Sequence, residues 1–459
     1  MATMLTNERE ITAANTIEVL KEHILVDGFH LVLDAQASHG AYLHDAASGE
    51  EYLDFYSFYA SQPISYNHPR MREPAFLARL LNAAALKVAN PDVYTRAYAE
   101  FVATVADVVG LPPLEKYFFI DGGALAIENA LKTAFDWKVR KNMAAGRGEG
   151  LGTQIVHFRH AFHGRSGYTM SLTNTDPVKV MHFPKFNWPR VDSPFIDYSL
   201  PEAERDADAV AREREAVRQI EQAVAQHGHD LAAVIIEPIQ GEGGDNHFRG
   251  EFLRTLRELC DRHEMLLIFD EVQSGMGLTG RNWCCEHFDV LPDILAFGKK
   301  MQICGIMAGP RIDDVDNVFK VPSRINSTFG GNLTDMVRAT QYLRIIDDER
   351  LVERAADTGA HLLDGLHRLA ERNACVTAPR GRGLMCAFDL PDAAIRNAFR
   401  TLCQQRRLLV LACGERSIRF RPVLDIDRAD VDRGLELIED ALRELESGCR
   451  TNGAAGASE

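Results

Sequence analysis

The sequence lacks features that would assign it to several common classes. Its nine cysteines form an odd set without any CxxC pair, and no long apolar run occurs in the opening segment MATMLTNEREITAANTIEVL. Scattered thiols without such a motif predict a reduced, cytoplasmic protein in which most cysteines are small core residues. The mixed charges of the opening segment predict neither a signal peptide nor a membrane anchor.

Positive charge is also in short supply. Lys and Arg total 51 against 66 Asp and Glu, which gives a formal net charge of −15. Such a surface repels nucleic acid and anionic membranes, so neither is expected as a partner and a small-molecule substrate is favoured. Hydrophobic residues make up 46% of the 459 residues, enough for a sizeable core. Because no repeat or composition shift divides the chain, we expect one large domain and a smaller one that share an interface.

Apolar strands alternate with helical patterns from about residue 70 onward. This alternation predicts an α/β fold, with a mostly parallel sheet in the large domain and helices on both of its faces. The strand candidates are KYFFID (116–121), TQIVHF (153–158), AAVIIEP (232–238), LLIFDE (266–271) and DILAFG (293–298).

The two ends of the chain have a different pattern. A helix at 10–24 precedes a small antiparallel meander, and two long helices after residue 331 precede short strands and a final helix, which predicts a smaller α+β domain. The expected division is an N-terminal segment packing with the small domain (1–69), a large cofactor-binding domain (70–330), a small domain (331–448) and a disordered tail (449–459).

Asp270 and Glu271 end one of the apolar strands, and glycines follow. Ligands of open α/β sheets bind at the carboxyl ends of the strands. A carboxylate at such a place is costly unless it meets a cation, and a protonated pyridine nitrogen is a suitable one. Taken alone, an Asp that caps the following turn is the commoner case.

Lys299 and Lys300 end the next strand, PDILAFGKK. A lysine at the end of a buried strand is suited to a lowered pKa and to imine formation. Because adjacent side chains of an extended chain point in different directions, at most one of the two can face a cofactor. Either could by itself be a solvated surface charge.

Two further segments supply groups at strand ends. Gly122 and Gly123 lie between a strand and a helix, where free backbone N–H groups can hold a phosphate, although a GG pair alone is more often only a turn. The segment FRHAFHGRSGYT offers Phe162 and His163 as aromatic planes and Arg165 as a carboxylate fork. A packed Phe and a surface Arg are equally compatible with that spacing.

EPIQGEGGD ends another strand and contributes two carboxylates. Glu237 is compatible with a structural cap. Glu242 lies in a glycine loop, where a mobile carboxylate is easily accommodated.

Together these segments resemble the class III aminotransferases of pyridoxal 5'-phosphate (PLP) fold type I, from about residue 20 to the last helix. The pattern Asp-Glu-Val-Gln, followed by a Pro-Asp strand that ends in Lys, is quite specific. The resemblance is carried by NPDVYT, FFIDGGALAIENALKTAFDWK, FHGRSGYTMSLTNT, FPKFNWPR, EPIQGEGGD, FGKK, NSTFGGNLTDMVR and RGRGLMCAFDLP.

The resemblance implies PLP as the cofactor, bound as a Schiff base to Lys299, and no metal. Asp270 is then expected beside the pyridine nitrogen. The remaining implied cofactor contacts are Gln273 to the phenolic oxygen, Val272 and Phe162 on the two ring faces, and Gly123 and Ala124 to the phosphate. Thr328 is expected to reach the phosphate of the neighbouring subunit, which implies a homodimer with shared active sites.

The resemblance further implies that the ε-amino group of lysine passes to 2-oxoglutarate in a ping-pong reaction. Arg165, Gln273 and Arg419 are then the expected substrate contacts, and Glu242 is a switch. Glu242 would cover Arg419 when lysine enters and move aside for 2-oxoglutarate.

Three positions depart from the common family pattern. Gly122 stands where many members have Ser or Thr, Leu278 replaces an Arg, and Ser274 replaces a Thr. Ornithine or 4-aminobutyrate remains an alternative donor, because one methylene is worth only about 1–3 kcal/mol of discrimination. A PLP aminomutase is disfavoured by the expected pairing of Glu242 with Arg419. A silent PLP-binding regulator is disfavoured because the lysine is present and no DNA-binding module is seen.

Overall fold

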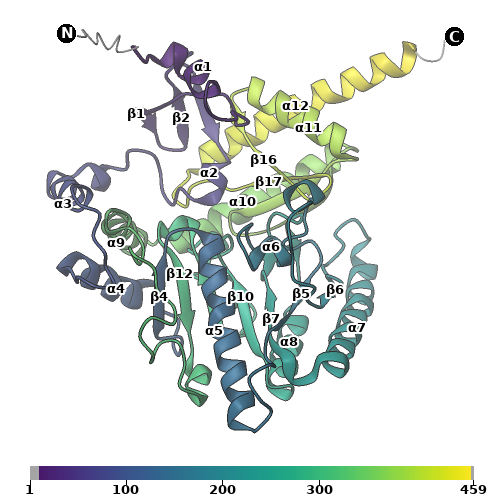
Figure 1. The fold of residues 1–459 in the computed structure, drawn as a ribbon. Coiled ribbons are helices and arrows are strands. Elements are labelled where there is room, and N and C mark those ends of the chain that lie inside the picture. Colours follow the sequence, from purple (N-terminus) through teal and green to yellow (C-terminus); the bar gives the residue numbers. More distant parts are fainter. Residues whose placement is uncertain (1–9, 456–459) are drawn as a thin grey trace, which may run out of the picture.

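The computed structural model describes residues 10–455, and its centre is a seven-stranded sheet in the order β4-β12-β11-β10-β7-β5-β6 (Figure 1). The strands are β4 (Lys116–Ile120), β5 (Gln154–Phe158), β6 (Arg190–Val191), β7 (Leu231–Ile236), β10 (Leu266–Asp270), β11 (Ile294–Phe297) and β12 (Cys304–Ala308). All neighbours pair in parallel except β12, which is antiparallel to both β11 and β4. The predicted mostly parallel sheet is confirmed, and its five predicted strands are present. The sequence analysis did not predict β6 and β12.

Helices cover both faces of this sheet, as predicted. Alternate residues of β10 enter different cores: Ile268 packs in the cluster that contains α5 residues, and Phe269 packs in the cluster that contains α8 residues. Figure 1 shows α5 crossing in front of the sheet, with α7 beside β6. The flanking helices are α5 (Gly123–Ala144), α6 (Thr169–Leu172), α7 (Glu202–His227) and α8 (Gly250–Arg262).

The opening meander packs beside the C-terminal part of the chain. Its strands are β1 (Leu33–His39), β2 (Tyr42–Asp45) and β3 (Glu51–Asp54), and β15 (Leu408–Leu409) joins β3 in parallel. A separate four-stranded antiparallel sheet consists of β13 (Thr377–Arg382), β14 (Met385–Asp389), β17 (Ser417–Phe420) and β16 (Leu411–Cys413). The helices α10 (Leu351–Arg372), α11 (Ala393–Gln405) and α12 (Arg428–Ala455) accompany it.

The remaining helices connect these parts. They are α1 (Thr16–Lys21), α2 (Ser57–Ala60), α3 (Pro74–Ala84), α4 (Arg96–Val109) and α9 (Leu333–Asp348), and the short strands β8 (Ile239–Gln240) and β9 (Asn246–His247) form a two-stranded sheet. Helix α9 packs against α3 and α4 as well as α10, so it links the sheet region to the C-terminal region.

The end of the chain differs from the expected tail. Helix α12 continues through Ala455, whereas the sequence reading ends it at residue 448 and expects a disordered tail at 449–459. A helix that already exists is extended without the cost of a new nucleus. Residues 456–459 lie outside the described part of the chain. No helix within residues 10–455 is long and apolar enough to cross a membrane.

Candidate active site

A cavity of about 360 Å³ lies at the carboxyl ends of the central strands. It collects nine of the residues that the sequence singles out: Gly123, Ala124, Phe162, Arg165, Glu242, Asp270, Val272, Gln273 and Lys299. His163, Gly164, Glu237 and Cys304 complete its lining. Residues up to 181 positions apart meet here, mainly because parallel strands end at one edge of the sheet.

Lys299 begins the turn that follows β11, and its backbone is held in the left-handed region with φ 49°. Such strain in a non-glycine residue is typical of functional sites. Gly298 makes the turn possible, since a Cβ there would lie 2.8 Å from Sγ of Cys304. Burial, reinforced by Arg419 and Arg421, lowers the pKa of Lys299 to about 7. At neutral pH a large fraction of this amine is therefore uncharged and able to act as a nucleophile or base.

Lys300 points away from the cavity. Its side chain is 2% exposed, and its Nζ donates to the backbone oxygens of Gln62 at 2.8 Å and Pro422 at 3.4 Å. It therefore ties the turn after β11 to the segments that precede and follow the central sheet. The two adjacent lysines face different directions, as the sequence predicts.

Asp270 ends β10 with its side chain in the cavity. Its Oδ2 lies 2.7 Å from Nδ1 of His163, and its Oδ1 accepts from the backbone N–H of Val272 at 3.1 Å. His163 is 2% exposed and fixes the direction of the carboxylate. The sequence analysis considered His163 only as an aromatic plane and did not predict its hydrogen bond to Asp270. Its position next to Phe162 was the one feature that indicated a residue of the site.

Glu271, next to Asp270, serves the fold instead. It accepts from the backbone N–H groups of Cys284 and Cys285 and from the hydroxyl of Ser274. Burial raises its pKa to about 7. Glu237 has a similar capping function at the cavity wall, where it accepts from the backbone N–H groups of Phe162 and Gly241.

The N-terminus of α5 opens on the same cavity. Its first residue is Gly123, and Gly122 before it has φ 99° and gives no side-chain cap. The first N–H groups of this 22-residue helix are thus left for a ligand. The wall is tight, since a Cβ on Gly164 would lie 2.5 Å from Cβ of Ala124. A phosphate fits this site because the helix supplies oriented donors and the favourable end of its dipole.

Gln273 is held by two arginines. Its Oε1 accepts from Nη1 of Arg419 at 3.1 Å and from Nε and Nη2 of Arg421 at 3.2 and 3.1 Å. Arginine only donates, so these contacts fix which end of the amide is oxygen and leave the NH₂ group for other acceptors. Arg421 in turn forms a fully buried ion pair with Asp245.

Arg419 is 4% exposed, and its Nε has no hydrogen-bond partner among the described residues. The carboxylate of Glu242, expected to cover Arg419 in one of two states, instead forms an ion pair with Lys179. The structure therefore has the arrangement in which Arg419 is uncovered. Lys179 was not identified from the sequence, because it follows no strand and belongs to no motif there.

Two predicted contacts are not among the lining residues of this cavity: Arg419, which bonds the lining residue Gln273, and Thr328. The Thr328 side chain is exposed, in the irregular segment before α9. Its assignment to a neighbouring subunit stays a prediction.

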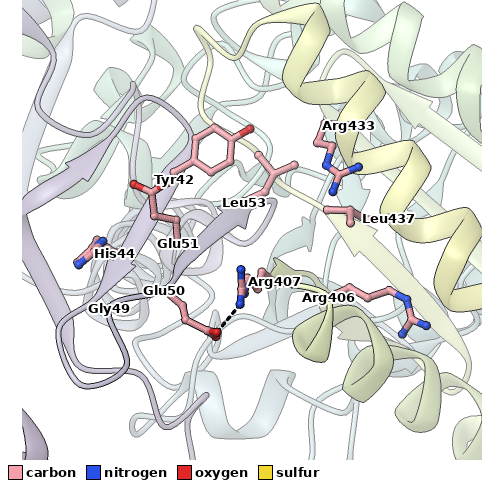
Figure 2. A pocket seen from close by; sticks show the side chains of 10 residues that line it. All are labelled: Tyr42, His44, Gly49, Glu50, Glu51, Leu53, Arg406, Arg407, Arg433 and Leu437. Carbon is pink, nitrogen blue, oxygen red and sulfur yellow. Dashed lines mark hydrogen bonds and ion pairs between the residues drawn. The ribbon is translucent and has the colours of Figure 1, made fainter.

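A second cavity, of about 650 Å³, lies between the N-terminal meander and the helices α11 and α12 (Figure 2). Tyr42 and Glu51 line one side, and three arginines line the other. The arginines pair with glutamates: Arg406 with Glu444, Arg407 with Glu50 and Arg433 with Glu436. None of the predicted site residues belongs to it, so the chemistry is placed in the first cavity.

The first cavity fits PLP. Lys299 would bind it covalently, Asp270 would face its ring nitrogen, and the α5 N-terminus would hold its phosphate. Together with the sheet, this set defines a PLP-dependent enzyme of fold type I. The chain belongs to the class-III aminotransferases: the model of that family matches residues 26–442. Its cofactor is pyridoxal 5'-phosphate.

Individual relatives agree with this assignment. The chain is 52% identical over 437 residues to the L-lysine-epsilon aminotransferase of Mycobacterium tuberculosis, covering 95% of this chain and 96% of that protein. It is 49% identical to the L-lysine-epsilon aminotransferase of Amycolatopsis lactamdurans, covering 94% and 96%. The structure of the lysine aminotransferase from M. tuberculosis in the internal aldimine form superposes with a TM-score of 0.93 at 51% identity, covering 95% of this chain and 100% of that one.

Proposed function

We propose that this enzyme transfers the ε-amino group of L-lysine to 2-oxoglutarate. The products are 2-aminoadipate 6-semialdehyde, which cyclises to piperideine-6-carboxylate, and L-glutamate. The observation that carries the donor is the similarity to L-lysine-epsilon aminotransferases over nearly the whole chain. The charge balance and reduced cysteines support a cytoplasmic enzyme that binds neither nucleic acid nor membrane.

The side chains of the cavity divide the chemistry between them. When bound, the cofactor supplies an electron sink for the substrate carbon that loses a proton. Lys299 Nζ takes that proton from the substrate carbon and passes it on to the cofactor. Its lowered pKa of about 7 suits a group that acts as both base and acid near neutrality. Asp270, oriented by His163, holds a proton on the ring nitrogen opposite.

The cations of the cavity select the co-substrates. Arg165 and Arg419 provide two forks for carboxylates, as a five-carbon dicarboxylate acceptor requires. When lysine enters with its ε-amine first, it brings no carboxylate to Arg419. The guanidinium of Arg419 would then be left unpaired beside the substrate. Glu242 lines the same cavity and is the carboxylate that can neutralise Arg419 in that half-reaction.

A donor screen tests the proposed function. Holoenzyme is incubated with 2-oxoglutarate and one donor: lysine, ornithine or 4-aminobutyrate. The glutamate formed is measured, and a trapping reagent detects the cyclised semialdehyde. We expect the highest kcat/KM with lysine and a trapped six-membered imine. A higher kcat/KM with ornithine or 4-aminobutyrate would assign the enzyme to that donor instead. Conversion of lysine without consumption of 2-oxoglutarate would indicate an aminomutase.

If Glu242 alternates between covering and freeing Arg419, variants of the two residues should impair opposite half-reactions. Arg419→Ala should weaken the 2-oxoglutarate half-reaction by about 2–5 kcal/mol, because a charge-assisted carboxylate pair is lost. Glu242→Ala should mainly impair the lysine half-reaction, or shift it to the α-amine, because the α-carboxylate can then bind Arg419. Single-turnover spectra from each cofactor form separate the halves. Equal losses in both halves for Glu242→Ala would contradict the switch.

The homodimer is tested at Thr328, whose exposed side chain is proposed to contact the cofactor phosphate of the neighbouring subunit. Thr328→Ala should raise the dissociation constant for PLP roughly fivefold to tenfold, since one hydrogen bond to a charged group is lost. Thr328→Ser is the matched control and should retain PLP as the wild type does. Light scattering that finds an active monomer at assay concentration would refute shared sites.

A further inference from the structure

Lys179 is a cation that the function derived so far does not use. It ends a short turn, Pro177–Lys179, and its ammonium pairs with the carboxylate of Glu242. The ammonium also lies 5.8 Å from the ring centroid of Phe162, which lines the cavity. The side chains of Lys179 and Glu242 are 28% and 23% exposed, so their ion pair is only partly screened by solvent.

Behind the lining residue Gln273 lies an arginine whose binding capacity is incompletely used. Arg419 gives Nη1 to Gln273, while its buried Nε has no acceptor among the described residues. A buried guanidinium with an unused donor is unfavourable until a carboxylate binds it. Glu242, a carboxylate on the cavity wall, is paired with Lys179 instead.

We propose that Lys179 is a specificity-determining residue that holds Glu242 away from Arg419 and so keeps Arg419 open for the carboxylate of the acceptor. Lys179 and Arg419 compete for one carboxylate. The relative strength of the two ion pairs, Glu242 with Lys179 and Glu242 with Arg419, sets two populations. In one, Arg419 is free to bind a dicarboxylate, and in the other, the cavity accepts the ε-amine end of lysine. This proposal rests on the proposed function, since it concerns the balance between its two half-reactions.

The local charges support this competition. Burial lowers the pKa of Lys179. The carboxylate of Asp176 acts against this shift, and the positive charges of Arg419 and Arg165 add to it, so both arginines lie close enough to repel the Lys179 ammonium. One carboxylate therefore relieves repulsion wherever it sits among them. Because the Glu242 side chain is still 23% exposed in its pair with Lys179, a modest change in either cation should shift the balance.

The test uses glutarate, an unreactive dicarboxylate of the same length as the acceptor, with purified holoenzyme at about 0.15 M salt. Lys179→Met keeps the apolar stem and removes the charge. We expect this variant to bind glutarate, measured by calorimetry, roughly three- to tenfold more weakly than the wild type. The apparent affinity for 2-oxoglutarate should fall by the same factor. The lysine half-reaction should stay unchanged or become faster. Lys179→Arg should restore wild-type values.

The double variant Lys179→Met/Glu242→Ala decides how Lys179 acts. If Lys179 works by holding Glu242, removing Lys179 should change glutarate affinity by less than about twofold once Glu242 is absent. Lys21→Met, on an exposed helix where Lys21 pairs with Glu18, controls for the loss of one positive charge. It should match the wild type.

The outcomes distinguish a failure of the proposed function from a failure of the inference about Lys179. A wild-type enzyme without a lysine half-reaction would refute the proposed function. With both wild-type half-reactions intact, an unchanged glutarate affinity in Lys179→Met would overturn the inference about Lys179. Equal weakening with and without Glu242 would also overturn it, since Lys179 would then contact the dicarboxylate directly.

Discussion

Lys299→Ala is expected to purify without covalently bound PLP and to lose activity by at least about four orders of magnitude. The cavity contains no second lysine among its lining residues, so no other amine there can replace it. Borohydride reduction followed by peptide mapping should place the cofactor of the wild-type enzyme on Lys299. Recovery of the labelled peptide with Lys300 modified would show that the assignment is wrong by one residue.

Lys300→Met provides the matched control next to the reacting residue. This variant should keep the covalent cofactor, because Lys300 points to Gln62 and Pro422 instead of the cavity. Two buried backbone acceptors lose their donor, so its free energy of unfolding should fall by about 1–3 kcal/mol. Denaturant titration and the absorbance of the bound cofactor measure the two effects separately.

Asp270→Asn should retain the cofactor on Lys299 but lower kcat by at least about 100-fold. An amide cannot hold a proton on the ring nitrogen, so the ring loses most of its capacity as an electron sink. The hydrogen bond between His163 and Asp270 also loses its charged partner. Steady-state kinetics measure the loss, and the pH dependence of the cofactor absorbance reports the altered ring environment without relying on turnover.

Glu271→Gln separates this electrostatic effect from the removal of any buried acid. Glu271 adjoins Asp270 but bonds Cys284, Cys285 and Ser274, outside the cavity lining. The variant should reduce stability while kcat stays within a few-fold of the wild type. A loss in Asp270→Asn no larger than that in Glu271→Gln would argue against the ring contact.

Local patterns predicted much of the frame of this enzyme. The strands β10 and β11 were predictable because each is a short apolar run that leads into a charged residue: Asp270 ends β10, and Lys299 begins the turn after β11. Gly122 and Gly123 marked the start of α5 because glycine punctuates a change from strand to helix. The antiparallel strand β12 escaped prediction because CGIMA follows the lysine turn directly, without the spacing of a further helix.

The sequence by itself determined the class of sheet, the residues at its strand ends and, through its family motifs, the cofactor. These depend on periodicity and local chemistry, which neighbouring residues encode. Only the tertiary structure decided that His163 orients Asp270, that Lys300 anchors the turn after β11, and that Glu242 pairs with Lys179. Such partners lie 63 to 238 positions apart in the chain, and their meeting depends on how the sheet, loops and C-terminal region pack together.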